Sequence, residues 1–226
     1  MKARSKRYKE SEKQADKNKV YSLKEAVACI KKSASPKFDA SIDIHFMLNI
    51  DPKKSEQMVR GTVLLPHGTG KQVRVAVFCK GEFEQLAKEA KADLVGSNEL
   101  IDKVAGGFLD FDCVIATPDM MKDLSKLGKV LGPRGLMPSP KTGTVTNDIV
   151  KAINDVKKGK VEFRVDKQGG IHLSVGKVSF SEEKITENAS CVIKAVNEAK
   201  PTTIKGKFVE GLSISSTMNP GFKLEI

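Results

Sequence analysis

The sequence predicts an α/β protein of two domains, in which a discontinuous α+β domain is interrupted by an inserted Rossmann-like, three-layer α/β domain. Strand-like runs with period-2 alternation lie in both terminal segments, residues 1–66 and 160–226. Between them, in residues 67–159, shorter apolar runs alternate with helical patterns, an order typical of a small parallel sheet. Two chain crossings, near Pro66 and Gly159, would then join the domains and form a hinge.

The first terminal segment is expected to fold as a helix followed by two strands. A Ser-Leu-Lys-Glu capping box at 22–25 opens the helix, and residues 33–36 end it. From residue 41 to residue 50, apolar and polar side chains alternate, which predicts a strand with one buried face. A shorter strand is expected at 61–65.

The inserted segment alternates short apolar runs with amphipathic patterns. We expect strands at 73–78, 93–95 and 113–117, and helices at 82–91, 98–104, 119–127 and 148–158. This order predicts a small parallel sheet with right-handed crossovers. Residues 127–145 contain four Gly and three Pro, so no long helix can cross them. We expect a structured loop there, with a phosphate-binding loop as the alternative.

The second terminal segment is expected to contain a β-hairpin, a helix and a last strand. Residues 161–165 and 171–175 alternate on either side of a turn at 166–170, which is a hairpin signal. Residues 181–199 have the apolar spacing of an amphipathic helix. The last strand is expected at 208–215.

The chain is strongly basic, with a formal net charge of +11 and a pI of about 9.4. Such an excess points to a polyanionic partner, nucleic acid in the first place, with solubility alone as the alternative. The two terminal segments together carry +9 of the +11, so we expect the polyanion on the discontinuous domain. Residues 1–19, with eight Lys/Arg and three Asp/Glu, fit either a solvated tail or a basic arm that orders on RNA.

Membrane proteins and enzymes find little support in the sequence. The N-terminus is too polar for a signal peptide and no apolar run approaches ~18 residues, so we expect a cytoplasmic protein with no membrane partner. The Gly-Thr-Gly-Lys run at 68–71 lacks the frame of a phosphate loop, and no spacing indicates a nucleophile–base pair. We therefore expect no enzyme and no cofactor.

Candidate metal ligands are also sparse. The four cysteines, at 29, 79, 113 and 191, form no C-x-x-C pair and have apolar neighbours, so we expect buried free thiols. Asp110 and Asp112 could coordinate a metal, although a turn before a buried strand is the commoner role of such a pair. We expect no metal site.

Two local features leave alternatives open. The Ser-Thr-Met-Asn-Pro-Gly segment at 216–221 suits the sugar edge and shallow minor groove of folded RNA, or it is an ordinary turn. Phe38, just before the long strand, either stacks on RNA or closes the core, and by itself the core is favoured.

Several motifs occur in a characteristic order along the chain. They are Phe38-Asp39 before the alternating strand, Asp51-Pro52, Arg60-Gly61-Thr62-Val63, the run from Leu65 to Lys71, Leu-Gly-Pro-Arg-Gly-Leu-Met-Pro at 131–138, and Ser216-Thr217-Met218. Together they resemble the L-one family of bacterial large-subunit ribosomal proteins over essentially the whole chain. The Gly-Pro-Arg-Gly run in this setting is highly specific.

The resemblance implies a cytoplasmic protein of the large ribosomal subunit whose terminal segments bind large-subunit rRNA. It also implies a mobile stalk by the exit site that assists release of deacylated exit-site tRNA. Repression of the protein's own operon, by binding a similar fold in the operon mRNA, is implied as well. The rRNA-binding residues carried over by motif are Lys37, Phe38, Ser41, Asp43, Asp166, Lys167, Gly170, His172, Thr217, Met218 and Asn219.

The resemblance also assigns roles within that set. Thr217 would bond a ribose or backbone group, Met218 would pack on RNA beside it, and Phe38 would support the surface. Two positions depart from the family pattern, since Asn219 replaces a usual Gly and Gly211 replaces a common hydroxyl residue. Because Asn tolerates the left-handed conformation, we expect the turn at 219 to persist.

Overall fold

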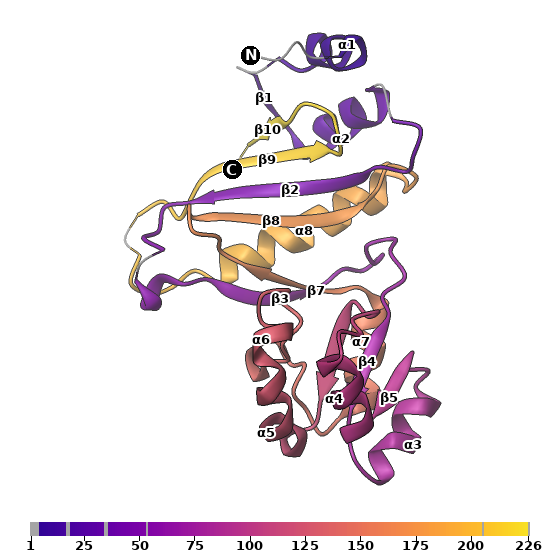
Figure 1. Cartoon of the computed structure of the whole chain (residues 1–226). Coiled ribbons are helices and arrows are strands. Elements are labelled where there is room, and N and C mark those ends of the chain that lie inside the picture. The colour runs from indigo at the N-terminus through magenta and orange to yellow at the C-terminus, as the bar shows by residue number, and fades with distance from the viewer. Residues whose placement is uncertain (1–4, 17–18, 34–35, 53, 205, 226) are drawn as a thin grey trace. The chain divides into compact units, whose positions relative to one another are not determined.

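The computed structural model describes residues 5–16, 19–33, 36–52, 54–204 and 206–225 (Figure 1). Parts of the basic stretch 1–19 and of the expected helix end at 33–36 therefore lie outside the described residues. The expected mixture of helices and sheets is confirmed. Contacts divide the chain into two compact units, which we call the discontinuous unit (residues 1–70 with 161–226) and the inserted unit (residues 71–160).

A five-stranded sheet forms the centre of the discontinuous unit. Its strands, in spatial order, are β1 (Val20–Tyr21), β10 (Phe222–Leu224), β9 (Val209–Ser216), β2 (Ser41–Leu48) and β8 (Gly170–Lys177). The long strand β2 pairs antiparallel with both β8 and β9. Strands β1 and β10, which pair parallel to each other at one edge, have no counterpart in the sequence-based expectation.

One face of this sheet is buried under two helices, α2 (Leu23–Lys32) and α8 (Glu182–Glu198) (Figure 1). The side chains of Ile42, Ile44, Phe46 and Leu48 are all buried in the shared core. Because side chains alternate along a strand, the polar residues between them lie on the opposite face. The helix α2 begins as predicted, with the Ser22 hydroxyl accepting a hydrogen bond from the Glu25 amide at 3.4 Å.

The prediction of a β-hairpin at 161–175 is wrong. Strand β7 (Lys160–Arg164) pairs instead with β3 (Arg60–Leu64) in a separate two-stranded sheet, and only β8 joins the five-stranded sheet. The turn between β7 and β8 does close, with the Asp166 amide donating to the Gly170 carbonyl at 2.9 Å. Beyond it the strands part, because the buried Phe163 ring packs on Gly61, where a Cβ would come within 2.6 Å.

A further correction concerns the basic N-terminal stretch. Residues Lys6–Gln14 form a helix, α1, where the sequence showed no apolar period. The Ser5 hydroxyl caps it by accepting a hydrogen bond from the Tyr8 amide at 3.3 Å. The capping hydrogen bond therefore stabilises the start of a helix that amphipathic periodicity does not predict.

The inserted unit contains a three-stranded parallel sheet with helices on both faces. Its strands, in spatial order, are β5 (Leu94–Gly96), β4 (Val75–Phe78) and β6 (Cys113–Ala116). One face packs against α4 (Asn98–Ala105), α5 (Met121–Leu124) and α6 (Gly128–Leu131), and the other against α3 (Glu82–Glu89) and α7 (Ile149–Lys158). The prediction of a single helix at 119–127 is wrong, because 3-10 turns at Pro118–Met120 and Ser125–Leu127 flank the short α5.

Residues 127–145 form a structured segment, as expected. The segment starts with α6, turns at Gly135, whose φ is +70°, and ends by pairing with the sheet. There the Ala116 amide donates to the Thr144 carbonyl at 2.9 Å, and Val145 bridges Ala116 in parallel. Leu131 and Pro138 are buried within it. Glycine and proline therefore fix a shape that packs on the sheet of the inserted unit.

Within the described part of the chain, no helix is both long and apolar enough to cross a membrane.

Candidate nucleic-acid interface

The uncovered face of the five-stranded sheet carries short polar side chains in aligned rows. In each row a residue of β2 stands between its partners on β8 and β9: Asp43 with Ser174 and Ser215, His45 with His172 and Ser213, and Met47 with Gly170 and Gly211. We call these nine residues, together with Ser41, the open face. Hydroxyl, imidazole and small side chains dominate it, so the face offers hydrogen-bond donors and acceptors.

The turn after β9 closes one end of the open face. The Thr217 amide and hydroxyl both donate to the Ser41 carbonyl, at 3.0 and 3.2 Å, which ties the turn to the start of β2. Met218 is 64% exposed and has a φ of +69°. The left-handed residue of this turn is therefore Met218, not Asn219, and the turn expected at this position persists, with the Asn219 backbone amide donating to the Ser216 carbonyl at 3.0 Å. Asn219 also donates its side-chain amide to the Ser216 hydroxyl at 2.9 Å.

Phe38 and Lys37 lie on the segment that leads into this same end. Phe38 is 51% exposed, so the interpretation that it closes the core is wrong. The segment is held in place because Asp39 accepts hydrogen bonds from the Ser179 amide at 3.1 Å and hydroxyl at 2.8 Å. From the N-terminal helix, Arg7 donates to the Met218 carbonyl at 3.4 Å. Cationic, aromatic and hydroxyl groups thus gather around Thr217.

The turn between β7 and β8 closes the other end. The Asp166 carboxylate accepts from the amides of Gln168 at 2.8 Å and Gly170 at 2.7 Å. These backbone hydrogen bonds, Gly170 first, lower the pKa of Asp166, and His172 contributes in the same direction. Gly169 has a φ of +84°, and Lys167 is exposed beside it. The carboxylate therefore stays ionised and fixes the turn.

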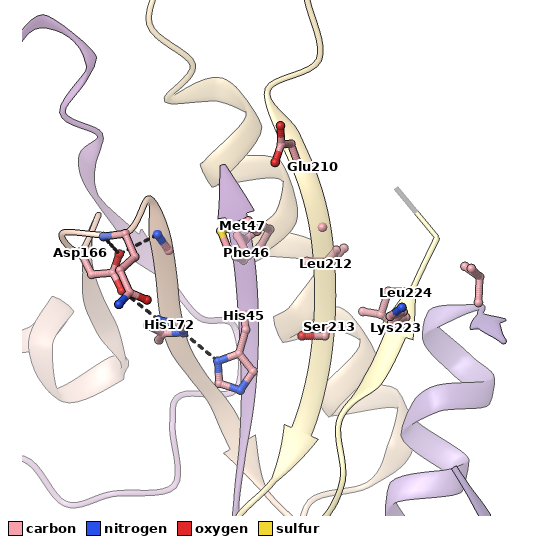
Figure 2. A pocket seen from close by; sticks show the side chains of 14 residues that line it. His45, Phe46, Met47, Asp166, His172, Glu210, Leu212, Ser213, Lys223 and Leu224 are labelled. Carbon is pink, nitrogen blue, oxygen red and sulfur yellow. Dashed lines mark hydrogen bonds and ion pairs between the residues drawn. The ribbon is translucent and has the colours of Figure 1, made fainter. Parts of the chain in front are cut away.

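Between the two ends, a chain of polar side chains crosses the open face (Figure 2). The Nδ1 atoms of His45 and His172 are 2.9 Å apart, and His45 Nε2 lies 3.1 Å from the Ser215 hydroxyl. His172 Nε2 is 3.5 Å from an Asp166 oxygen. The pair borders a shallow hollow of about 570 Å³, whose rim includes the half-exposed Met47. Burial lowers the pKa of His45, His172 lowers it further, and Asp43 partly offsets both.

A polar face of this kind could serve several classes of ligand, whereas the similarity to known proteins identifies the family. Residues 30–220 match the model of the ribosomal protein L1p/L10e family. The chain belongs to this family. It is 54% identical over 223 residues to the large ribosomal subunit protein uL1 of Fervidobacterium nodosum, covering 98% of this chain and 95% of that protein.

Two further L1p/L10e relatives carry the same name, large ribosomal subunit protein uL1. The protein of Bifidobacterium longum is 52% identical over 222 residues, covering 98% of this chain and 96% of its own length. That of Thermosipho melanesiensis is 54% identical over 221 residues, covering 97% of this chain and 95% of its own. The resemblance stated from the sequence motifs is thereby confirmed.

The eleven residues that the motifs implied all lie in the discontinuous unit of this L1p/L10e chain, in two groups. Lys37, Phe38, Ser41, Asp43, Thr217, Met218 and Asn219 lie at one end of β2. Asp166, Lys167 and Gly170 lie at the other, and His172 follows them along β8, opposite His45. The ends are roughly 23 Å apart at the usual rise of about 3.3 Å per residue. His45, Met47, Ser213 and Ser215, which join the two groups, were missed. The alternation along residues 41–49 already placed His45 and Met47 on the polar side.

The two residues predicted to form a hinge lie close to the boundaries between the units. The first boundary follows Gly70 and the second follows Lys160, whereas the sequence pointed to Pro66 and Gly159. Gly159 ends α7 with a φ of +108°. The segment after Pro66 is held by the buried Asn188 of α8, which accepts from the His67 amide at 3.2 Å. Its amide group also donates to the Gly68 carbonyl at 3.0 Å.

The other candidate ligands take structural roles. Asp110 and Asp112 both pair with Arg74, Asp112 at 3.2 Å. Among the residues that the structure describes, no group of three or more possible ligands could hold a metal ion. Cys79 is buried, and burial raises the pKa of its thiol to about 11, so the thiol stays protonated. Cys29, Cys113 and Cys191 are only partly buried, which corrects the expectation of four buried thiols.

Proposed function

We propose that the protein is a structural constituent of the large ribosomal subunit, in the cytoplasm, that binds large-subunit rRNA through the open face and its two ends. The observation that carries the proposal is the Thr217 turn. It places an exposed methionine, a tethered hydroxyl and the exposed Phe38 and Lys37 beside Ser41. Family membership, and the name that its relatives bear, supports the choice of large-subunit rRNA.

The chemistry of this surface suits folded RNA. An A-form helix presents 2′-hydroxyls and base edges in a wide, shallow minor groove, which is read by shape and by hydroxyl contacts. The Thr217 hydroxyl gives its hydrogen to Ser41, so its lone pairs remain available to accept from a ribose 2′-hydroxyl. Met218 offers an apolar, polarizable side chain beside that contact.

The distribution of charge supports the same assignment. The discontinuous unit carries 24 Lys/Arg and 16 Asp/Glu, a net +8, against +3 for the inserted unit. The open face itself carries few of these charged residues. Cationic residues lie around it instead, for example Lys37, Lys167 and those of the helix α1. We therefore propose that surrounding cations supply the attraction to phosphates and that the open face supplies the discrimination.

A competition assay tests the proposal. The labelled ligand is a folded large-subunit rRNA junction, and the competitor is random RNA of equal length, measured over a range of salt concentrations. We expect the junction to be preferred at least about 1,000-fold, the lower end of the usual range for specific against non-specific binding. Equal competition by both RNAs, with a steep salt dependence, would instead identify a non-specific nucleic-acid binder.

We further propose the two finer activities that the family resemblance implies. As part of a mobile stalk, the inserted unit would contact exit-site tRNA and assist its release, supported by the exposed Lys129, Arg134 and Lys141 of the structured segment. The open face would also bind a similar fold in the operon mRNA and repress translation. If the operon mRNA binds the open face, mRNA and rRNA must exclude each other. Simultaneous binding of both RNAs to one protein would therefore reject the proposed repression.

A further inference from the structure

The histidine pair on the open face contains a hydrogen-bonding constraint that the proposed function does not use. Between two Nδ1 atoms 2.9 Å apart, a hydrogen bond requires one nitrogen to carry a hydrogen and the other to be bare. Each ring also has a partner at its Nε2 atom: Asp166 for His172 at 3.5 Å, and the Ser215 hydroxyl for His45 at 3.1 Å. The four groups form one chain, Asp166–His172–His45–Ser215, of which Figure 2 shows the part from Asp166 to His45.

When the pair is neutral, every hydrogen bond in this chain can point toward Asp166. Ser215 donates its hydroxyl hydrogen to His45 Nε2, His45 Nδ1–H donates to His172 Nδ1, and His172 Nε2–H faces the carboxylate. The ionised Asp166 requires this direction at its end of the chain, because a carboxylate can only accept. In this state the Ser215 hydrogen is engaged with His45.

Adding one proton reverses part of the chain. The proton from solvent joins His45 at Nε2, and the hydrogen between the rings moves from His45 Nδ1 to His172 Nδ1. His172 is then the cation, with one N–H toward His45 and the other toward Asp166, and His45 remains neutral. His45 Nε2–H now donates to the Ser215 oxygen, which releases the Ser215 hydrogen to an outside acceptor. A second proton would place hydrogens on both facing Nδ1 atoms and is opposed.

We propose that His45 and His172 form a one-proton site inside the RNA-binding face, which makes RNA binding tighter as pH falls. His172 is the cation that meets the RNA, and its side chain is 56% exposed. His45 is a positioning residue that accepts the hydrogen of His172 and controls the direction of the Ser215 hydroxyl. The inference rests on the proposed function for its ligand, and on the geometry of the free protein for the proton site.

The charged groups around the two histidines favour the binding of a single proton, with its charge on His172. Asp166 faces His172 from the turn, and Asp43 lies near His45 on β2. Glu210 of β9 and Lys223 of β10 line the same hollow, one of each sign. Burial disfavours charge on His45, whereas the more exposed His172 keeps access to solvent and to an anionic ligand. Phosphate groups brought close by RNA favour the charged state further.

The first test uses the unmodified full-length protein without RNA. NMR titration of the histidine ring protons follows all three histidines, and His67 serves as an internal comparison. We expect His45 and His172 to take up a single proton between them, with coupled shifts and with the charge residing mainly on His172. Independent uptake of one full proton by each ring would overturn the inference, whatever the result with RNA.

The second test measures affinity for the rRNA junction at pH 8 and pH 6. Linkage to one proton allows an increase of up to about tenfold per pH unit, and we expect an increase of several-fold overall. His172→Gln should lose most of this pH dependence. His45→Ala should reduce it, because the His172 Nδ1–H then loses its acceptor, and His67→Gln should keep it. The same pH dependence in all four proteins would overturn the inference. A wild-type protein that fails to distinguish the junction from random RNA would refute the proposed function, while the titration still decides the proton site.

Discussion

Asn188 of α8 provides a direct test of how the chain is held where it leaves the discontinuous unit. Its side chain is fully buried and makes three hydrogen bonds to backbone groups. It donates to the Val175 carbonyl at 2.8 Å and the Gly68 carbonyl at 3.0 Å, and accepts from the His67 amide at 3.2 Å. Replacing it with Ala removes all three bonds and leaves the Val175 carbonyl buried without this donor.

The expected loss of stability follows from these contacts. Each lost hydrogen bond costs roughly 1 kcal/mol, and an unsatisfied buried carbonyl adds about 1–3 kcal/mol. We therefore expect Asn188→Ala to lower the free energy of unfolding of the discontinuous unit by about 4–6 kcal/mol, or its Tm by about 10 °C or more. The tyrosine band of the near-UV circular dichroism spectrum reports on this unit selectively, because both tyrosines, Tyr8 and Tyr21, lie in it and the chain has no Trp.

A matched control comes from the same helix. Asn197 is exposed, so Asn197→Ala should change the free energy of unfolding by no more than about 0.5 kcal/mol. If Asn188→Ala also lost less than about 1 kcal/mol, the reasoning would be refuted, because the three hydrogen bonds would then not hold residues 67 and 68 to α8.

Three further predictions address the surface and its charges. Thr217→Val should weaken rRNA junction binding by about 1–3 kcal/mol, and Thr217→Ser should retain most of the affinity; equal affinities for both variants would show that the hydroxyl has no part in binding. Arg134→Ala should leave junction affinity within about twofold, so a tenfold loss in the same binding assay would contradict our placement of the rRNA site. Arg74 lowers the pKa of Asp112 mainly through a side-chain hydrogen bond, so this pair stabilises the fold above the ordinary pKa of Asp and ceases to do so as pH falls through the lowered value. In acid unfolding monitored by far-UV circular dichroism, Arg74→Gln should reduce that pH dependence. An unchanged acid-unfolding profile would show that the pair does not contribute to the pH dependence of stability.

Local patterns in the sequence predicted the elements whose neighbours are close in the chain or whose periodicity is strong. The alternation along residues 41–50 located β2 and its buried face, because the side-chain period of two leaves one choice of register. The capping box at Ser22 located the start of α2. The pairing of β7 with β3 could not be predicted in this way, because residues 60–64 and 160–164 are far apart in the chain and the turn at 166–170 is a genuine local hairpin signal.

The candidate site was predicted at its two ends and missed in its middle. Motif resemblance located the Thr217 and Asp166 turns, which have distinctive residues. Ser213 and Ser215 have no such signature, and they become part of the surface only because β9 pairs with β2 in the observed register. The contact between His45 and His172, which are 127 residues apart, likewise depends on tertiary pairing that periodicity does not encode.

The most direct test of the open face as the rRNA site is a pair of variants with the same change in charge. Ser213→Glu places a carboxylate on the open face, and Asn197→Glu places one at an exposed position of α8, the helix that packs against the opposite face of the sheet. Affinity for the folded rRNA junction should fall at least about tenfold for Ser213→Glu, equivalent to about 1.4 kcal/mol, and less than about twofold for Asn197→Glu. Equal losses in the two variants, or no loss in Ser213→Glu, would contradict the assignment of rRNA binding to the open face.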